Sequence, residues 1–116
     1  MRALAPVLLL AACAAPATPT LRFIGTLTPA VPSDACRASG ASLVLRDGVA
    51  LFTPDEGTWS LTGTATAGGD VTAERTASGA DKKPYATRLN ARWTPEAATG
   101  EDLTPRCTFK LSAPVR

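Results

Sequence analysis

Apolar and polar residues alternate one by one over several short stretches of the chain, and this period of two is typical of β-strands with one buried face. The best alternation spans 85–94, where one face carries Tyr85, Thr87, Leu89, Ala91 and Trp93. The same pattern predicts strands over 21–28, 58–65, 71–76 and 106–113. The polar segment 95–102 lacks the pattern and is expected to be a loop.

The strongest local signal is a predicted hairpin around Asp47-Gly48, which separates the apolar runs 42–46 and 49–53. Asp-Gly favours a two-residue type I′ turn, because both turn positions need a positive φ. This turn fixes the register, placing Arg46 opposite Val49, Leu45 opposite Ala50 and Leu43 opposite Phe52.

No segment shows the 3.6-residue period of an amphipathic helix, so the fold class is predicted to be all-β. About seven short strands joined by hairpin-length turns predict an antiparallel meander closed into a small barrel. A β-sandwich is the alternative. The length of 116 residues allows one such domain, over 21–116.

The chain begins with a basic residue, an apolar run and a cysteine. The run 3–12 is too short to span a bilayer, which takes about 20 residues, but it suits the core of a signal peptide. Leu10-Ala11-Ala12-Cys13 resembles the lipobox of bacterial lipoproteins. The resemblance implies a signal peptide over 1–12, a lipid anchor on Cys13 and a flexible tether over 13–20.

The residue that follows Cys13 bears on which membrane the lipoprotein is anchored to. In lipoproteins, an Asp at this position resembles a signal for retention in the inner membrane. This chain has Ala14 at that position. The resemblance therefore implies lipid anchoring to the outer membrane, on its periplasmic side. Ala12-Cys13-Ala14 also fits an A-x-A cleavage site, so a soluble periplasmic or secreted product stays open.

Three cysteines would leave one odd thiol, but both cleavage routes take Cys13 out of the fold. Cys36 and Cys107 remain, and an even pair in an oxidising compartment predicts one disulfide. Closing a loop of 71 residues stabilises the fold by roughly 4 kcal/mol in the chain-entropy model. Two cysteines without histidine fall short of a four-ligand zinc site, so no metal is expected.

The sequence offers little for catalysis, and we expect a protein that is not an enzyme and holds no cofactor. Histidine is absent, and the net charge of +2 gives no basic excess for nucleic acid. Asp55-Glu56 and Glu101-Asp102 are adjacent loop residues whose side chains diverge, so they are expected to be solvated charges. Ser78 with Lys82 or Lys83 lies in a polar loop, without the surroundings that activate a Ser-Lys pair.

The polar connection 78–84 and the outward faces of the last two predicted strands carry the candidate partner-binding residues. Arg88, Arg92, Arg106 and Lys110 are expected to lie side by side and, with Lys82 and Lys83, to attract an anionic envelope polymer or protein. The alternative is an ordinary solvated face. The inward aromatic residues predict core packing, and a carrier of a small apolar ligand is the alternative for Trp59 and Trp93.

Ala77-Ser78-Gly79-Ala80, Tyr85 and Trp93-Thr94 are similar in order to the inhibitory loop of the periplasmic and membrane-bound inhibitors of c-type lysozyme. Members of that family are small barrel lipoproteins with a cysteine near each end. The resemblance implies that Ser78 enters the lysozyme cleft. Pro95 stands where the family has a lysine, and Lys82 or Lys83 could substitute for it only by position. The leading expectation is a non-enzymatic envelope lipoprotein that binds an unidentified partner.

Overall fold

The structure, a computed structural model, describes residues 19–54, 59–78 and 81–116. The predicted signal peptide, Cys13, most of the tether, the pair Asp55-Glu56 and Gly79 lie outside the described residues.

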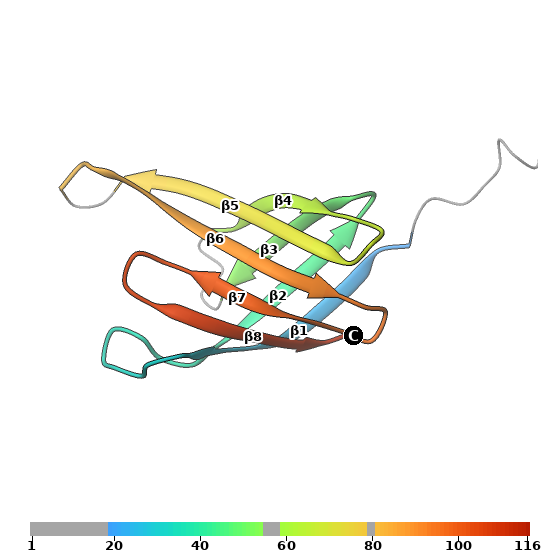
Figure 1. Cartoon of the computed structure of the whole chain (residues 1–116), viewed down its shortest axis with the longest axis horizontal. Helices are drawn as coiled ribbons and strands as arrows, with labels where there is room; N and C mark the ends of the chain where they lie inside the picture. Colours follow the sequence, from blue (N-terminus) through green and yellow to red (C-terminus); the bar gives the residue numbers. More distant parts are fainter. Residues whose placement is uncertain (1–18, 55–58, 79–80) are drawn as a thin grey trace, which may run out of the picture.

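The described residues form eight antiparallel strands that pair in chain order and close into a barrel, so the predicted all-β barrel is confirmed (Figure 1). They contain no helix that is long and apolar enough to cross a membrane. The strands are β1 (Leu21–Pro29), β2 (Ser39–Arg46), β3 (Val49–Pro54), β4 (Leu61–Ala65), β5 (Asp70–Ser78), β6 (Pro84–Trp93), β7 (Ala97–Leu103) and β8 (Thr108–Pro114).

The predicted β2–β3 hairpin is confirmed in its turn and in its register. Arg46 pairs with Val49 and Leu43 with Phe52. Asp47 and Gly48 have φ values of 52° and 78°, as a type I′ turn requires.

The segment 95–102 is not a loop, and this prediction is wrong. Most of it belongs to β7, whose inward residues Ala98 and Asp102 are buried and flank Gly100. Two small residues and an acid give no apolar alternation, which is why the pattern does not mark a strand there. Four boundaries also differ by two or three residues: β2 begins at Ser39, β4 at Leu61 and β8 at Thr108, and β5 ends at Ser78.

β7 changes the arrangement of the cationic residues. It pairs with β6 on one side and with β8 on the other. Arg88 and Arg92 on β6 are therefore separated by a whole strand from Lys110 on β8 and from Arg106 in the preceding turn. The prediction that these four cations lie side by side is wrong.

The middle of the barrel is filled by side chains. The largest fully buried apolar residues come from six of the eight strands: Phe23, Leu27, Leu43, Phe52, Leu61, Val71 and Leu89. Burying a side chain of this kind contributes about 1.5–3 kcal/mol, so this cluster is the main source of stability. A ligand cannot occupy the barrel centre without displacing it.

The disulfide predicted between Cys36 and Cys107 is present, with a Cα–Cα distance of 5.8 Å. It joins the β1–β2 loop to the β7–β8 turn. β1 and β8 pair along the seam that closes the barrel, from Thr26 with Ser112 to Pro29 with Phe109. The bond therefore fastens the seam at one end of the barrel.

The two ends of the barrel differ. At the end that holds the start of β1 and the end of β8, Trp93 packs against the core and its indole N–H donates to the carbonyl oxygen of Thr66, at 2.9 Å. We call this the closed end. The opposite end holds the disulfide, the β5–β6 hairpin and the β7–β8 turn, and it is hollowed.

Candidate binding site at the open end

A cavity of about 740 Å³ lies at the end of the barrel opposite the start of β1. We call it the mouth cavity. Its apolar wall includes Trp59, which precedes β4, Tyr85 near the start of β6, and Phe109 near the start of β8. Its remaining lining residues include Ala35, Asp81, Lys83, Thr87, Thr104 and Arg106.

The three aromatic residues lie at the open end of the barrel, near the first residues of β4, β6 and β8. Trp59 and Phe109 are half-buried and pack against the core, while Tyr85 is 40% exposed. The prediction that Tyr85 faces inward is therefore correct for the direction of its side chain. The side chain is not buried, since it lies at the rim of the cavity. Aromatic rings that are apolar on one side and wet on the other are typical of binding surfaces.

Arg75 is a site residue that the sequence reasoning missed. It follows Val71 and Ala73 on the inward face of β5 and pairs in register with buried Thr87. Its guanidinium carbon lies 5.4 Å from the centroid of the Trp59 ring, within range of a cation–π contact. A smaller hollow of about 50 Å³ beside the mouth cavity is lined by Arg75 and shares Trp59, Tyr85 and Thr87 with it.

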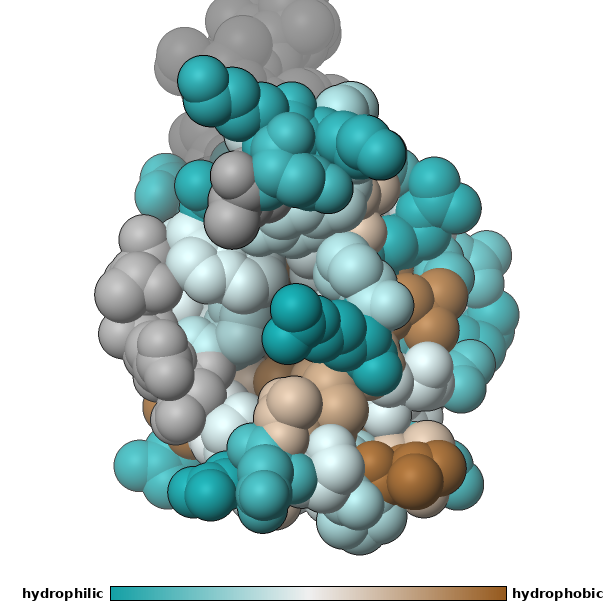
Figure 2. All heavy atoms as spheres, turned by 90° about the vertical axis from the view of Figure 1, so that its left-hand side faces the viewer, coloured by the Kyte–Doolittle hydropathy of each residue, from teal (hydrophilic) through white to brown (hydrophobic). Residues whose placement is uncertain are grey.

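Polar residues surround the mouth cavity. Figure 2 looks at this end of the molecule and shows hydrophilic residues around and across a centre of weakly apolar and apolar surface. Asp81 and Lys83 come from the β5–β6 hairpin, and Arg106 comes from the β7–β8 turn. The site thus combines an aromatic wall with charged groups at its edge.

Asp102 is a buried acid inside the barrel. It is 2% exposed and pairs in register with Leu89 and with Phe109 of the mouth cavity. No described group hydrogen-bonds to its Oδ1. Loss of solvation by burial raises the pKa of Asp102 from 3.8 to about 6. The prediction that Glu101 and Asp102 are both solvated loop charges is wrong for Asp102.

The predicted partner-binding residues fall into separate places. Lys83 and Tyr85 line the mouth cavity. Ser78 is exposed and pairs with Pro84 at the base of the β5–β6 turn, and Lys82 is exposed in that turn with a φ of 64°.

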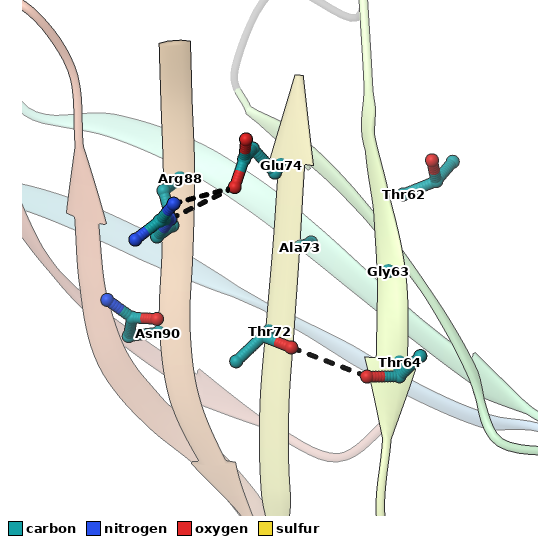
Figure 3. Close-up of a pocket in the computed structure, with 8 residues that line it drawn as sticks. All are labelled: Thr62, Gly63, Thr64, Thr72, Ala73, Glu74, Arg88 and Asn90. Atoms are coloured by element: carbon teal, nitrogen blue, oxygen red, sulfur yellow. Dashed lines mark hydrogen bonds and ion pairs between the residues drawn. The ribbon is translucent and has the colours of Figure 1, made fainter. Parts of the chain in front are cut away.

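Arg88 lies on the outer face, in a shallow groove of about 300 Å³ across β4, β5 and β6. Figure 3 shows that the groups of this groove already bind one another. Arg88 donates two hydrogen bonds to one carboxylate oxygen of Glu74, at 2.8 and 3.1 Å, and the hydroxyls of Thr64 and Thr72 lie 3.3 Å apart. A ligand here would compete with these contacts.

Arg92 lies at the closed end, where it pairs with Asp70 and donates to the carbonyl oxygen of Gly68 at 3.0 Å. Both arginines of β6 therefore hold neighbouring strands and turns together. Of the predicted binding residues, Lys83, Tyr85 and Arg106 meet at one hollow.

Within the described ranges, no three His, Cys, Asp or Glu side chains gather as metal ligands would. Comparison of the chain with family models, curated proteins and solved structures gave no match.

Proposed function

We propose that the protein is a non-enzymatic binding module of the bacterial cell envelope, anchored by a lipid on Cys13, that takes a small molecule with an apolar body into the mouth cavity. The observation that carries this proposal is the aromatic wall of that cavity. Ligand pockets commonly measure 300–1,000 Å³ and combine apolar walls with a few polar groups, and the mouth cavity fits both criteria.

The filled barrel supports a surface site in preference to an internal one. Phe52, Leu61 and Leu89 occupy the centre and are fully buried. A bound molecule therefore contacts Trp59, Tyr85 and Phe109 at the end of the barrel and stays partly accessible to solvent. Such a site suits capture and release of a small molecule.

The direction of the chain supports a tethered arrangement. β1 starts at the closed end, so a tether that precedes Leu21 would join the barrel at the end opposite the mouth cavity. The disulfide is the kind of bond that persists in exported proteins. We place the domain on the periplasmic side of the outer membrane, with a soluble periplasmic product as the alternative.

Binding of the neutral fluorophore phenylnaphthylamine to the purified, disulfide-bonded domain tests the cavity. We expect saturable enhancement of its fluorescence. Ala35→Trp should abolish it, because Ala35 lines the cavity and an indole there fills it. Ala67→Trp places the same side chain in the exposed β4–β5 turn at the closed end and should leave binding unchanged. Equal binding by both variants would refute the proposed site.

The anchor has its own test, the intact mass of the protein isolated from cells. We expect a product that begins at Cys13 and carries acyl chains. A product that retains Met1, or one that starts after Cys13 without acyl mass, would refute the lipoprotein assignment.

A second candidate function is inhibition of c-type lysozyme, and the shape of the β5–β6 hairpin favours it. Strand β6 is the longest in the barrel, and the hairpin reaches beyond its neighbours at the open end (Figure 1). Ser78 and Lys82 are exposed on it. Titration of the domain into a lysozyme assay decides the matter, since no slowing of lysis at a large molar excess removes this candidate.

A further inference from the structure

We propose that the molecule bound in the mouth cavity carries an anionic group, a carboxylate, phosphate or sulfate, which Arg75, Lys83 and Arg106 bind. This inference rests on the proposed function, because it names the chemical class of the ligand for the same site. It adds a charged head to the apolar body that the aromatic wall selects.

The position of Arg75 is the first step. Arg75 continues the inward face of β5, where the preceding inward residues Val71 and Ala73 are apolar and buried. A charged side chain at this position departs from that pattern. At the end of β5 the guanidinium reaches the Trp59 ring instead of an acid. A cation–π contact with an aromatic face leaves N–H groups of the guanidinium available for an oxyanion.

The other two cations come from separate elements that meet at the same hollow. Lys83 leads into β6, and Arg106 lies in the turn before β8. Asp81 is the one acid among the described residues that line the mouth cavity, and its carboxylate accepts a hydrogen bond from the backbone N–H of Lys83, at 3.0 Å. Among the described residues that line the mouth cavity or the smaller hollow beside it, three cations thus stand against one acid.

The arginines elsewhere on the barrel behave differently. Arg88 is paired with Glu74 and Arg92 with Asp70. Within the part of the chain that the structure describes, no carboxylate lies within ion-pair distance of Arg75, Lys83 or Arg106. Positive charge at the mouth is therefore left uncompensated by those residues, and it attracts an anion.

Two fluorophores that share one ring system test the charge directly. Anilinonaphthalene sulfonate is phenylnaphthylamine with an added sulfonate. We expect the sulfonate to bind about ten-fold more tightly than the neutral compound, because a hydrogen bond to a charged group contributes about a factor of ten. The preference should weaken as salt is added, since these cations are exposed.

The double variant Arg75→Gln/Lys83→Gln should strongly reduce the preference for the sulfonate, with Arg106 as the remaining cation, while binding of the neutral compound persists. Each single substitution should reduce the preference in part, so the result does not depend on one variant folding. Arg92→Gln removes a cation at the closed end and should keep the full preference.

Equal affinities in the unmodified domain, or an unchanged preference in the double variant, overturn the anionic head and leave the proposed cavity intact. Absence of binding by either compound overturns the proposed function together with this inference. Displacement of the bound sulfonate by an alkyl carboxylate, an alkyl phosphate or an alkyl sulfate of equal chain length then identifies which oxyanion the site prefers.

Discussion

Asp102 gives the sharpest prediction, because it is an acid at a buried inward position where an apolar residue is expected. It occupies an inward position of β7 between Leu89 and Phe109 and is 2% exposed. Its Oδ1 has no hydrogen-bond partner among the described residues. Ionisation here loses hydration, and no described residue compensates it with a hydrogen bond to Oδ1, which is why burial raises the pKa of Asp102 to about 6.

The raised pKa fixes the sign of the pH dependence. The folded protein holds the Asp102 proton more tightly than the unfolded chain does. The stability that Asp102 contributes is therefore fully present below the ordinary pKa of 3.8 and is lost as the pH rises through about 6. A difference of about two pKa units corresponds to about 3 kcal/mol of unfolding free energy.

The perturbation is Asp102→Asn, measured by urea unfolding across this pH range. At a pH well above 6 the variant should be more stable than the parent by about 1–3 kcal/mol, because it removes a buried charge but keeps an amide to be satisfied. The gain should shrink as the pH falls toward 4, where the parent is protonated. Asp102→Leu should show the same dependence of the stability gain on pH, and it leaves no buried amide to be hydrogen-bonded.

Glu101→Gln is the matched control, since Glu101 is the exposed neighbour on the same strand. Its stability difference from the parent should lack a transition near pH 6. A gain for Asp102→Asn that is equal at all pH values, or a loss of stability above pH 6, would refute the reasoning, because either result means that ionised Asp102 is well compensated.

Three further predictions concern the frame of the barrel. Replacing Cys36 and Cys107 with serine should lower the unfolding free energy by about 4 kcal/mol, measured by urea unfolding, and reduction of the parent should lower it similarly. Gly63→Ala should destabilise by at least about 1–3 kcal/mol in thermal unfolding, because its Cβ would overlap the backbone carbonyl of Thr72, whereas Ala in place of exposed Gly68 should be far milder. Trp93→Phe should cost about 1 kcal/mol through the lost hydrogen bond to Thr66, and an unchanged denaturation midpoint would contradict it.

The alternation of residues predicted most of the barrel because one face of nearly every strand is buried and apolar. The β2–β3 hairpin was predictable to the residue, since Asp47-Gly48 dictates both the turn and the register. The disulfide followed from the parity of the cysteines. β7 was not predictable in this way, because Ala98, Gly100 and Asp102 on its inward face carry no apolar signal.

The binding site was less predictable, because it depends on which strands end at the same place. Lys83 and Tyr85 were identified, but they were grouped with Arg88 and Arg92, which the structure places elsewhere and pairs with acids. Arg75 could have been identified from the sequence, because it continues the series of inward residues Val71 and Ala73. It was overlooked because a search for apolar alternation ignores a charged residue at an inward position.

The charged residues at inward positions lie toward one end of the molecule, and their location supports the proposed function there. Polar residues at inward positions weaken a core, and natural proteins tolerate such local conflicts mainly at functional sites. Arg75 and Thr87 lie together at the open end, and Asp102 pairs with Phe109 of the same cavity. At the closed end the inward residues Leu45, Ala50 and Val71 follow the pattern without exception. This distribution supports the proposal that the open end binds a ligand.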